Sequence, residues 1–265
     1  MTSDQFVTMD DGARLYVLAE PPSQKPPLLF SNSLGTNLHM WDAQAAAFAD
    51  RFRIIRYDSR GHGRSDAPPG PYTIERLGRD AVQLLDALGI ERVNFCGLSK
   101  GGMVGQWLGV NAPERIVRMA LCNTSSYMPP RETWEARIAA VAAGGMAAIA
   151  DIVIERWFTK PFRDRAPQEV GRVRDMLLST PPIGYCGCVA ALRDMDQRQT
   201  IKAIRVPTLV LAGALDPATP PEHGRLIHAA IKGSEFVVLP DVAHLSNVEQ
   251  TEAFNRAVLA FLSEN

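Results

Sequence analysis

The sequence has little of what marks secreted, membrane-spanning or nucleic-acid-binding proteins. Only four of its 265 residues are cysteines, and they are scattered along the chain. We therefore expect buried, apolar thiols in a reducing compartment rather than a disulfide framework. No apolar run is long enough to cross a bilayer. The net charge is only -1, which predicts no basic surface for nucleic acid or for anionic lipid.

Signals for export, metals and cofactors are also missing. The segment Met1–Gln5 has no basic stretch followed by an apolar one, so we expect no secretory signal and a cytoplasmic protein. Cys186-Gly187-Cys188 lacks the spacing and the second pair of a zinc site. We expect neither a metal nor a cofactor. The composition, 46% hydrophobic and 22% charged, is ordinary for a globular protein, and it does not indicate an oligomeric state.

Strand-like and helical patterns alternate over most of the chain. The expected strands are Phe6–Met9, Arg14–Leu18, Leu28–Ser31, Phe52–Tyr57, Val93–Cys96, Ile116–Cys122, Leu209–Gly213 and Phe236–Leu239. The expected helices between and after them are Trp41–Phe48, Tyr72–Leu88, one directly after Ser99, Pro221–Ile231 and Glu249–Leu262. Alternation of this kind predicts an α/β fold with a mostly parallel sheet flanked by helices.

The alternation stops between about Ser125 and Gln199. Strand patterns vanish there, and prolines at 129–130, 161 and 181–182 punctuate four helical stretches, namely Glu132–Ala143, Ala147–Phe158, Gln168–Leu178 and Gly187–Met195. We interpret residues 125–199 as a helical cap inserted into the sheet domain. Residues 1–124 and 200–265 would then form the core, a length that one main domain can accommodate.

The segment Gly97-Leu98-Ser99-Lys100-Gly101 lies between a predicted strand and a predicted helix. Gly-x-Ser-x-Gly alone is a weak pattern, and its simplest interpretation is a glycine-rich turn. The flanking strand and helix favour a sharp turn that exposes the Ser99 hydroxyl, with glycines where side chains would collide. Ser99 is therefore the candidate nucleophile.

A serine nucleophile needs a base and a carboxylate that orients the base. Asp216 follows the strand Leu209–Gly213, and His244 follows the strand Phe236–Leu239, so both belong at the same edge of a parallel sheet as Ser99. Asp241 is an alternative acid on the same loop as His244. The order Ser99, Asp216, His244 is that of α/β hydrolases. The remaining histidines are expected to be structural or surface residues: His39, His62, His223 and His228.

An oxyanion formed during acyl transfer needs two backbone N–H donors. One should come from Lys100, directly after the nucleophile, and the other from Leu34 in the loop after the strand Leu28–Ser31. The Lys100 side chain has two open interpretations. It either points inward and adds positive charge beside Ser99, or points outward as a solvated residue at a helix start.

With these residues in place, the chain resembles the α/β-hydrolase family, and within it the 3-oxoadipate enol-lactonases of bacterial aromatic-acid catabolism. The segments that carry the resemblance include Asn32-Ser33-Leu34-Gly35-Thr36, Gly97-Leu98-Ser99, Asp216-Pro217-Ala218-Thr219-Pro220-Pro221 and Ala243-His244-Leu245-Ser246-Asn247. Relatives usually carry an apolar residue where this chain has Lys100. The resemblance implies that an enol-lactone of the β-ketoadipate pathway is opened through an acyl-enzyme on Ser99.

An enol-lactone of this kind bears a free carboxylate, so a cationic partner is expected on the cap. The candidates are Arg131, Arg137, Arg156, Lys160 and Arg193, with Trp134 as a wall. The sequence does not choose among them; Trp134, Arg137 and Arg193 are singled out as substrate-binding residues. Other α/β-hydrolase activities remain open, namely a carboxylesterase, a carbon–carbon bond hydrolase or a perhydrolase. A silent ligand-binding protein is disfavoured because no triad member is lost.

Overall fold

The computed structural model describes residues 3–264; residues 1, 2 and 265, which the predicted core includes, lie outside the described residues. The described strands form one sheet in the order β1-β2-β4-β3-β5-β6-β7-β8. Their bounds are β1 Ser3–Thr8, β2 Arg14–Ala19, β3 Pro27–Ser31, β4 Arg53–Tyr57, β5 Val93–Leu98, β6 Ile116–Cys122, β7 Thr208–Gly213 and β8 Glu235–Leu239. The strands from β4 to β8 along this order pair in parallel, and β1 and β2 are antiparallel.

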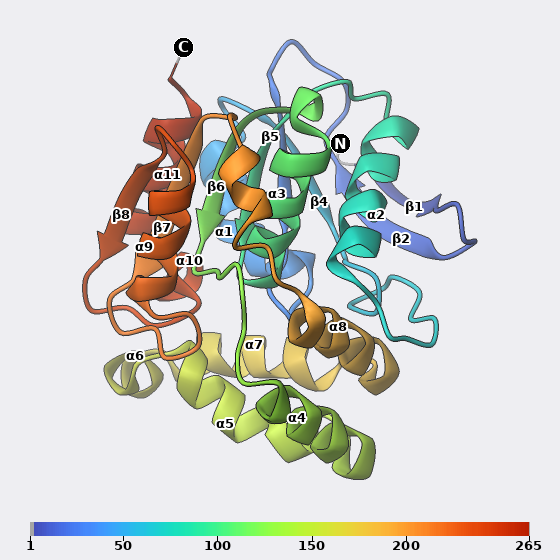
Figure 1. Ribbon diagram of the computed structural model, residues 1–265, viewed down its shortest axis with the longest axis vertical. Coiled ribbons are helices and arrows are strands. Elements are labelled where there is room, and N and C mark those ends of the chain that lie inside the picture. Colours follow the sequence, from blue (N-terminus) through green and yellow to red (C-terminus); the bar gives the residue numbers. More distant parts are fainter. Residues whose placement is uncertain (1–2, 265) are drawn as a thin grey trace.

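Helices cover both faces of this sheet (Figure 1). They are α1 Asp42–Phe48, α2 Ile74–Ala87, α3 Lys100–Asn111, α9 Pro221–Ala230, α10 Ser246–Glu249 and α11 Thr251–Leu262, with short 3-10 helices η1 Leu38–Trp41, η2 Pro113–Arg115 and η3 Thr200–Ala203. Every residue of β5 and of β7 is buried, as expected for central strands covered on both sides. No helix in residues 3–264 combines the length and the apolar character that a membrane crossing requires.

Five helices lie between β6 and β7, beyond the carboxyl ends of the parallel strands (Figure 1). They are α4 Arg131–Gly144, α5 Ala147–Trp157, α6 Lys160–Arg165, α7 Pro167–Leu178 and α8 Pro182–Asp194. Helices α4 and α8 pack against each other, as do α4 and α5. We call this segment the cap. The division of the chain into 1–124 with 200–265 and 125–199 stays a prediction.

Most helix ends lie within one or two residues of the predicted ones, and three larger differences remain. Helix α8 begins at Pro182 rather than at Gly187, because proline suits the first helical turn, where no N–H is needed. The short α6 was not predicted; the Thr159 hydroxyl accepts a hydrogen bond from the Phe162 N–H and caps its start. The expected helix Glu249–Leu262 is divided into α10 and α11, since Gln250 has a non-helical backbone with φ -131° and ψ 57°.

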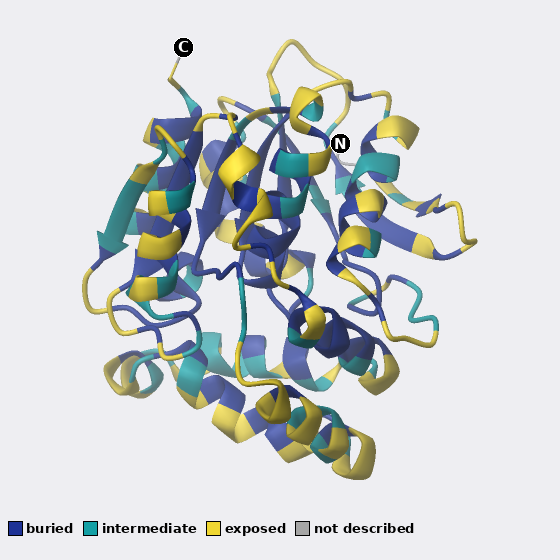
Figure 2. Ribbon diagram, viewed as in Figure 1, coloured by how far each residue is buried: buried dark blue, intermediate teal, exposed yellow. Residues whose placement is uncertain are grey.

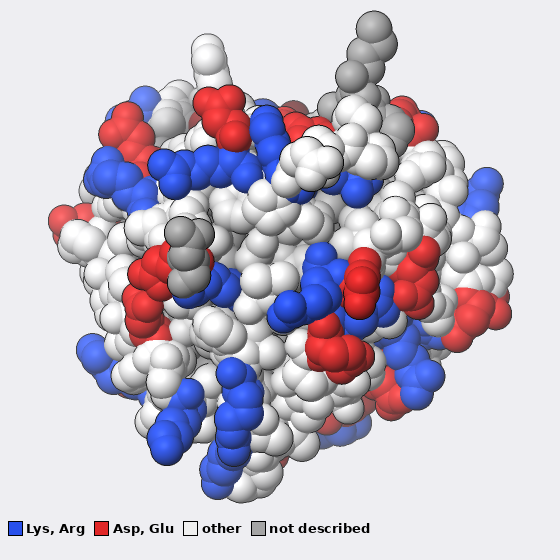
Figure 3. Space-filling view, turned by 90° about the horizontal axis from the view of Figure 1, so that it is seen from above, with Lys and Arg blue, Asp and Glu red and all other residues white. Residues whose placement is uncertain are grey.

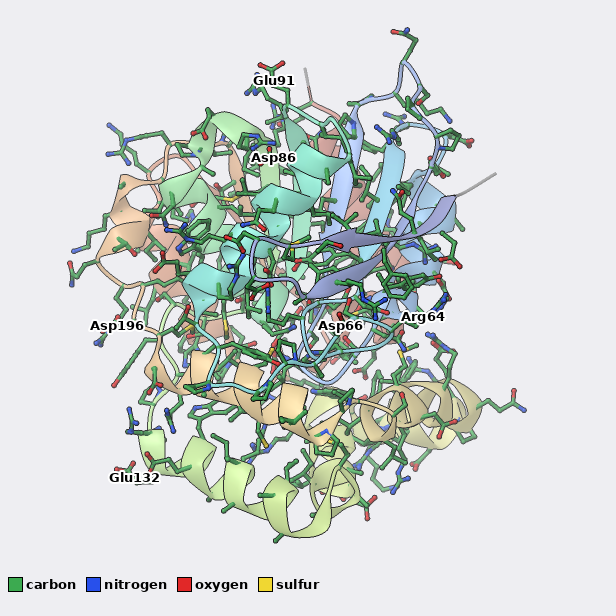
Figure 4. The ribbon with its side chains drawn as sticks, turned by 90° about the vertical axis from the view of Figure 1, so that its right-hand side faces the viewer. Arg64, Asp66, Asp86, Glu91, Glu132 and Asp196 are labelled. Carbon is green, nitrogen blue, oxygen red and sulfur yellow. The ribbon has the colours of Figure 1, made fainter. Side chains whose placement is uncertain are left out.

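Burial follows this layered arrangement. The central strands β5 and β7 are buried throughout, the edge strands β1 and β8 are only partly buried, and α4 and α5 alternate buried and exposed residues along their length (Figure 2). On the face seen from above in Figure 3, Lys and Arg lie beside Asp and Glu, without a field of one sign. Peripheral charges such as Arg64 and Asp66 are paired, with Asp4 at 3.2 Å and Arg14 at 3.0 Å (Figure 4). Such exposed pairs contribute little to stability, so the buried sheet carries the fold.

Candidate active site

Ser99 lies at the turn from β5 to α3 in a backbone conformation that side chains rarely adopt, with φ 57° and ψ -115°. A Cβ at Gly97 would lie 2.3 Å from the Gly101 carbonyl oxygen, and one at Gly101 would lie 2.0 Å from the Ser31 carbonyl oxygen, which explains why both positions are glycine. The Ser99 N–H donates to the Cys122 carbonyl at 2.9 Å, and the Ser99 carbonyl accepts from the Thr124 hydroxyl at 2.7 Å. The neighbouring strand therefore holds the strained turn in place.

Asp216 and His244 form a buried pair at the ends of β7 and β8. The His244 Nδ1 lies 2.8 Å from Asp216 Oδ2. The carboxylate also accepts hydrogen bonds from the Asn123 amide at 3.0 Å and from the Thr219 N–H and hydroxyl at 2.9 and 2.8 Å. Burial opposes ionisation of Asp216, but the imidazole and these donors outweigh it and hold the pKa of Asp216 below its usual value. The group is therefore an ionised acceptor.

An ionised Asp216 fixes the tautomer of His244. Its Nδ1 must carry the proton that is donated to the carboxylate, which leaves the Nε2 lone pair as a proton acceptor. Ser99 and His244 both line one cavity. Among the described residues, Asp241 makes no hydrogen bond to His244. The geometry thus pairs His244 with Asp216 rather than with the alternative acid, while the catalytic roles stay a prediction.

The two predicted oxyanion donors follow two neighbouring strands, Leu34 after β3 and Lys100 after β5. Leu34 lines the same cavity as Ser99, and Lys100 is the first residue of α3. In residues 3–264, neither backbone N–H donates to a protein acceptor. The N–H groups flanking Leu34 are both bonded, Ser33 to Met40 Sδ at 3.4 Å and Gly35 to His62 Nε2 at 2.9 Å. Leu34 therefore has a free donor at the cavity.

The Lys100 side chain is buried, at 1% exposure, so its interpretation as a solvated residue is wrong. Its Nζ has no hydrogen-bond partner in the described chain, and Lys100 is not among the cavity-lining residues. Burial lowers the pKa of the Lys100 amine, against the opposing influence of Cys188, Asp58 and Asp80. The side chain points inward, away from the substrate cavity.

The cavity has a volume of about 290 Å³ and lies between the sheet edge and the cap. Its lining joins Ser99, His244 and Leu34 from the core to Trp134 and to apolar cap residues. Two arginines, Arg137 and Arg156, are also part of the lining, which contains no Asp or Glu. A cavity of this size and polarity fits a small anionic molecule.

The five cationic candidates on the cap fall into two groups. Arg131 and Arg193 both pair with Asp194 at 2.7 Å, and Lys160 pairs with Asp164 at 2.7 Å. The structure does not place Arg193 at the cavity. Arg137 and Arg156 form no ion pair within the described residues; Arg137 instead stacks on the Trp134 ring, 5.0 Å from its centroid. The two arginines at the cavity therefore keep their charge available.

Three buried side chains that the sequence analysis did not identify support the site. Asn123 donates to Asp216 and to the Ala243 carbonyl, and Thr219 lies 3.3 Å from His244 Nδ1. Glu249 accepts from the Ala243 N–H at 3.1 Å. Of these three, only Thr219 could have been found from the sequence. It lies three residues after Asp216, where a hydroxyl can fold back onto the carboxylate.

Comparisons with known proteins agree with this geometry. A family model described as the alpha/beta hydrolase fold matches residues 26–150, and one described as TAP-like protein matches residues 186–265. The chain is 42% identical to a 3-oxoadipate enol-lactonase of Acinetobacter baylyi, covering 91% of this chain and 90% of that protein. A second such enzyme of that organism is 36% identical, over 97% and 96% of the two chains. The crystal structure of an enol-lactonase from Burkholderia xenovorans LB400 superposes with a TM-score of 0.96 at 41% identity, covering 98% of this chain and all of that one.

Proposed function

The chain belongs to the alpha/beta hydrolase family and is a carboxylic ester hydrolase, and from this premise we propose that it opens 3-oxoadipate enol-lactone to 3-oxoadipate. Two relatives named for this reaction, at 42% and 36% identity, support the assignment. The cavity that holds Ser99, His244 and two unpaired arginines suits an anionic lactone. The reaction would belong to the β-ketoadipate pathway of aromatic-compound catabolism.

In the first half-reaction, Ser99 Oγ attacks the lactone carbonyl while His244 Nε2 takes its proton. The negative charge that develops on the carbonyl oxygen is stabilised by the N–H groups of Leu34 and Lys100. When the tetrahedral intermediate collapses, the ring C–O bond breaks and the imidazolium returns the proton to the leaving oxygen. The enol that is released relaxes to a ketone, which makes it a good leaving group.

In the second half-reaction, water attacks the acyl-enzyme. His244 removes a proton from the water, a second tetrahedral intermediate forms at the same two donors, and the proton passes to Ser99 Oγ as the ester bond breaks. The product leaves as a dicarboxylate. Throughout, Asp216 keeps the imidazole in the Nδ1–H tautomer and stabilises its charged form, as its 2.8 Å contact allows.

Arg137 and Arg156 are proposed to bind the carboxylate that the reaction leaves unchanged. A guanidinium that pairs with no carboxylate among residues 3–264 can donate charge-assisted hydrogen bonds to a substrate oxyanion. Trp134 holds Arg137 by stacking, 5.0 Å from its centroid, and forms part of the wall. This assignment replaces Arg193, whose guanidinium is engaged by Asp194.

The observation that carries the proposal is the pairing of Asp216 with His244, which lines the same cavity as Ser99. The test is turnover of the enol-lactone by the wild type, by Ser99→Ala and by the surface control Ser23→Ala. We expect loss of turnover only in Ser99→Ala, with an unchanged circular dichroism spectrum. Hydrolysis that survives in Ser99→Ala would refute Ser99 as the nucleophile.

Substrate class is tested separately with the wild type. Rates are compared on the enol-lactone, on a neutral lactone of like size, on p-nitrophenyl acetate and on a vinylogous diketoacid. We expect the highest kcat/KM for the enol-lactone. A higher kcat/KM for the neutral lactone or for the acetate would indicate an esterase. A higher kcat/KM for the diketoacid would indicate a carbon–carbon bond hydrolase.

A further inference from the structure

The imidazole of His62 is fully buried under the loop that carries Leu34. Its Nε2 accepts a hydrogen bond from the Gly35 N–H at 2.9 Å, and its Nδ1 lies 3.1 Å from the Arg60 carbonyl oxygen. Because Nε2 accepts, the proton of the neutral ring must be on Nδ1, from which it is donated to Arg60. A protonated ring would place N–H against N–H at Gly35 and break this contact.

The Gly35 N–H belongs to the peptide group directly after Leu34. Its hydrogen bond to His62 therefore fixes the peptide plane that follows Leu34. The Leu34 N–H itself belongs to the preceding peptide group, whose Ser33 carbonyl oxygen accepts from the Thr36 hydroxyl at 3.0 Å and from the Thr36 N–H at 3.4 Å. The imidazole thus holds the plane on one side of Leu34 and Thr36 holds the plane on the other, while the Leu34 N–H donates to no acceptor in residues 3–264.

Lys100 is also buried, at 1% exposure, and its charge acts on this imidazole. Burial and the positive charge of Lys100 both hold the pKa of His62 well below its usual range. The other side-chain group that faces the ring is the thiol of Cys188 on α8, 3.9 Å from His62 Nδ1. No carboxylate contacts the ring in residues 3–264. The surroundings thus favour the neutral form, the only form that can accept from Gly35.

We propose that His62 is a positioning residue for the reaction: its Nδ1–H imidazole accepts from the Gly35 N–H and so holds the Leu34 N–H in the direction of the Ser99 oxyanion. The proposal rests on the roles proposed above for Ser99 and Leu34. It assigns to the Arg60-Gly61-His62-Gly63 turn a part in catalysis that acts through Leu34 rather than through contact with the substrate.

The first test compares His62→Leu, which removes the acceptor, with His62→Gln, whose side-chain oxygen can reach the position of Nε2. Rates are expressed per active site, counted by complete labelling with a fluorophosphonate, so that unfolded protein is excluded. We expect kcat of His62→Leu to fall about 10- to 100-fold with KM nearly unchanged, because an oxyanion donor acts in the transition state. We expect His62→Gln to recover most of this loss.

A normal kcat per labelled site in His62→Leu would overturn the proposal, as would a loss confined to KM or an equal loss in His62→Gln. The surface variant His228→Gln is the control and should match the wild type. The proposed function fails independently if Ser99→Ala remains active. An inactive Ser99→Ala together with a fully active His62→Leu would reject only the role of His62.

The second test needs no variant of His62. Two-bond ¹H–¹⁵N correlation spectra of the wild type report the tautomer and charge of each imidazole. We expect His62 to be neutral with its proton on Nδ1 at neutral pH, and to take up a proton only below the usual range of a histidine. In Lys100→Met, protonation of His62 should begin at a higher pH than in the wild type. A proton on Nε2, or a charged ring at neutral pH, would contradict the proposal; a titration that is the same in both proteins would contradict the influence of Lys100 on the ring.

Discussion

The carboxylate of Glu249 accepts a hydrogen bond from the backbone N–H of Ala243, 3.1 Å away, directly before His244. The same buried carboxylate accepts from the Thr159 N–H at 3.2 Å, in the segment that joins α5 to α6. In parallel, the Leu245 N–H donates to the Trp157 carbonyl at 3.1 Å. The loop of the proposed base is thus tied to the cap on both sides of His244.

Replacement of Glu249 by Ala should weaken both the fold and the reaction. The buried N–H of Ala243 would lose its acceptor, which costs about 1–3 kcal/mol, and the half-buried N–H of Thr159 would lose the same acceptor at a smaller cost. Urea unfolding should show this loss, and kcat should fall because the His244 loop is less well fixed. Glu249→Gln keeps one acceptor oxygen, so its stability and its kcat should lie between those of the wild type and those of Glu249→Ala. The exposed Glu252→Ala is the control; a wild-type kcat in Glu249→Ala would contradict the coupling.

Lys100→Met should stabilise the protein. The Lys100 amine is buried at 1% exposure with no hydrogen-bond partner in the described chain, and methionine fills a similar shape without a polar group. We expect the free energy of unfolding to rise by about 1–3 kcal/mol at neutral pH. Urea titration measures it, with the exposed Lys232→Met as a control that should leave stability unchanged. A less stable Lys100→Met would mean that the amine has a favourable partner.

The burial of His62 predicts a dependence of stability on pH. Its pKa is lowered in the folded state, so below about pH 6.5 the unfolded chain binds a proton at this site that the folded chain does not. The free energy of unfolding should therefore decrease as the pH is lowered, and this group should contribute about 1.4 kcal/mol for each pH unit. Urea titrations at several pH values give the slope of the free energy of unfolding against pH. In His62→Gln this slope should be smaller than in the wild type, by the amount that corresponds to one bound proton. Equal slopes would contradict a neutral His62.

Asp216→Asn should remove most of the activity while the protein still folds. An amide at this position no longer enforces a proton on His244 Nδ1, and we expect kcat to fall by a factor on the order of 10⁴. The control is Asp241→Asn, which changes the alternative acid at a backbone position with φ 53° that asparagine tolerates. It should stay within about twofold of the wild type. The reverse ranking would assign the carboxylate role to Asp241.

The core and the order of the site residues could be predicted because both follow from local patterns along the chain. Buried parallel strands are nearly continuous apolar runs, as in β5 and β7, where Asn94 and Thr208 are the polar exceptions, and the residues after them meet at one edge of the sheet. What the sequence could not give depends on packing between distant segments. Asn123 contacts Asp216 across 93 residues of chain, and no local pattern distinguishes Arg156 at the cavity from Arg193 held by Asp194.

Arg156 provides the sharpest test of substrate charge. It lines the cavity and forms no ion pair in residues 3–264, so its guanidinium should bind the carboxylate of the enol-lactone. Loss of such a charge-assisted hydrogen bond corresponds to about 10- to 100-fold in kcat/KM. We expect Arg156→Met to show this loss on the enol-lactone, mainly in KM, because the carboxylate is bound alike in the ground and transition states.

The same variant should hydrolyse p-nitrophenyl acetate at nearly the wild-type rate, because this ester carries no carboxylate for the guanidinium to bind. The matched control is Arg163→Met, a cap arginine that pairs with Glu155 at 3.6 Å and does not line the cavity. It should be normal on both substrates. An equal loss on both substrates in Arg156→Met would mean that Arg156 shapes the cavity rather than recognising charge. A loss in Arg163→Met would show that the effect arises from the cap as a whole, since this side chain cannot reach the substrate.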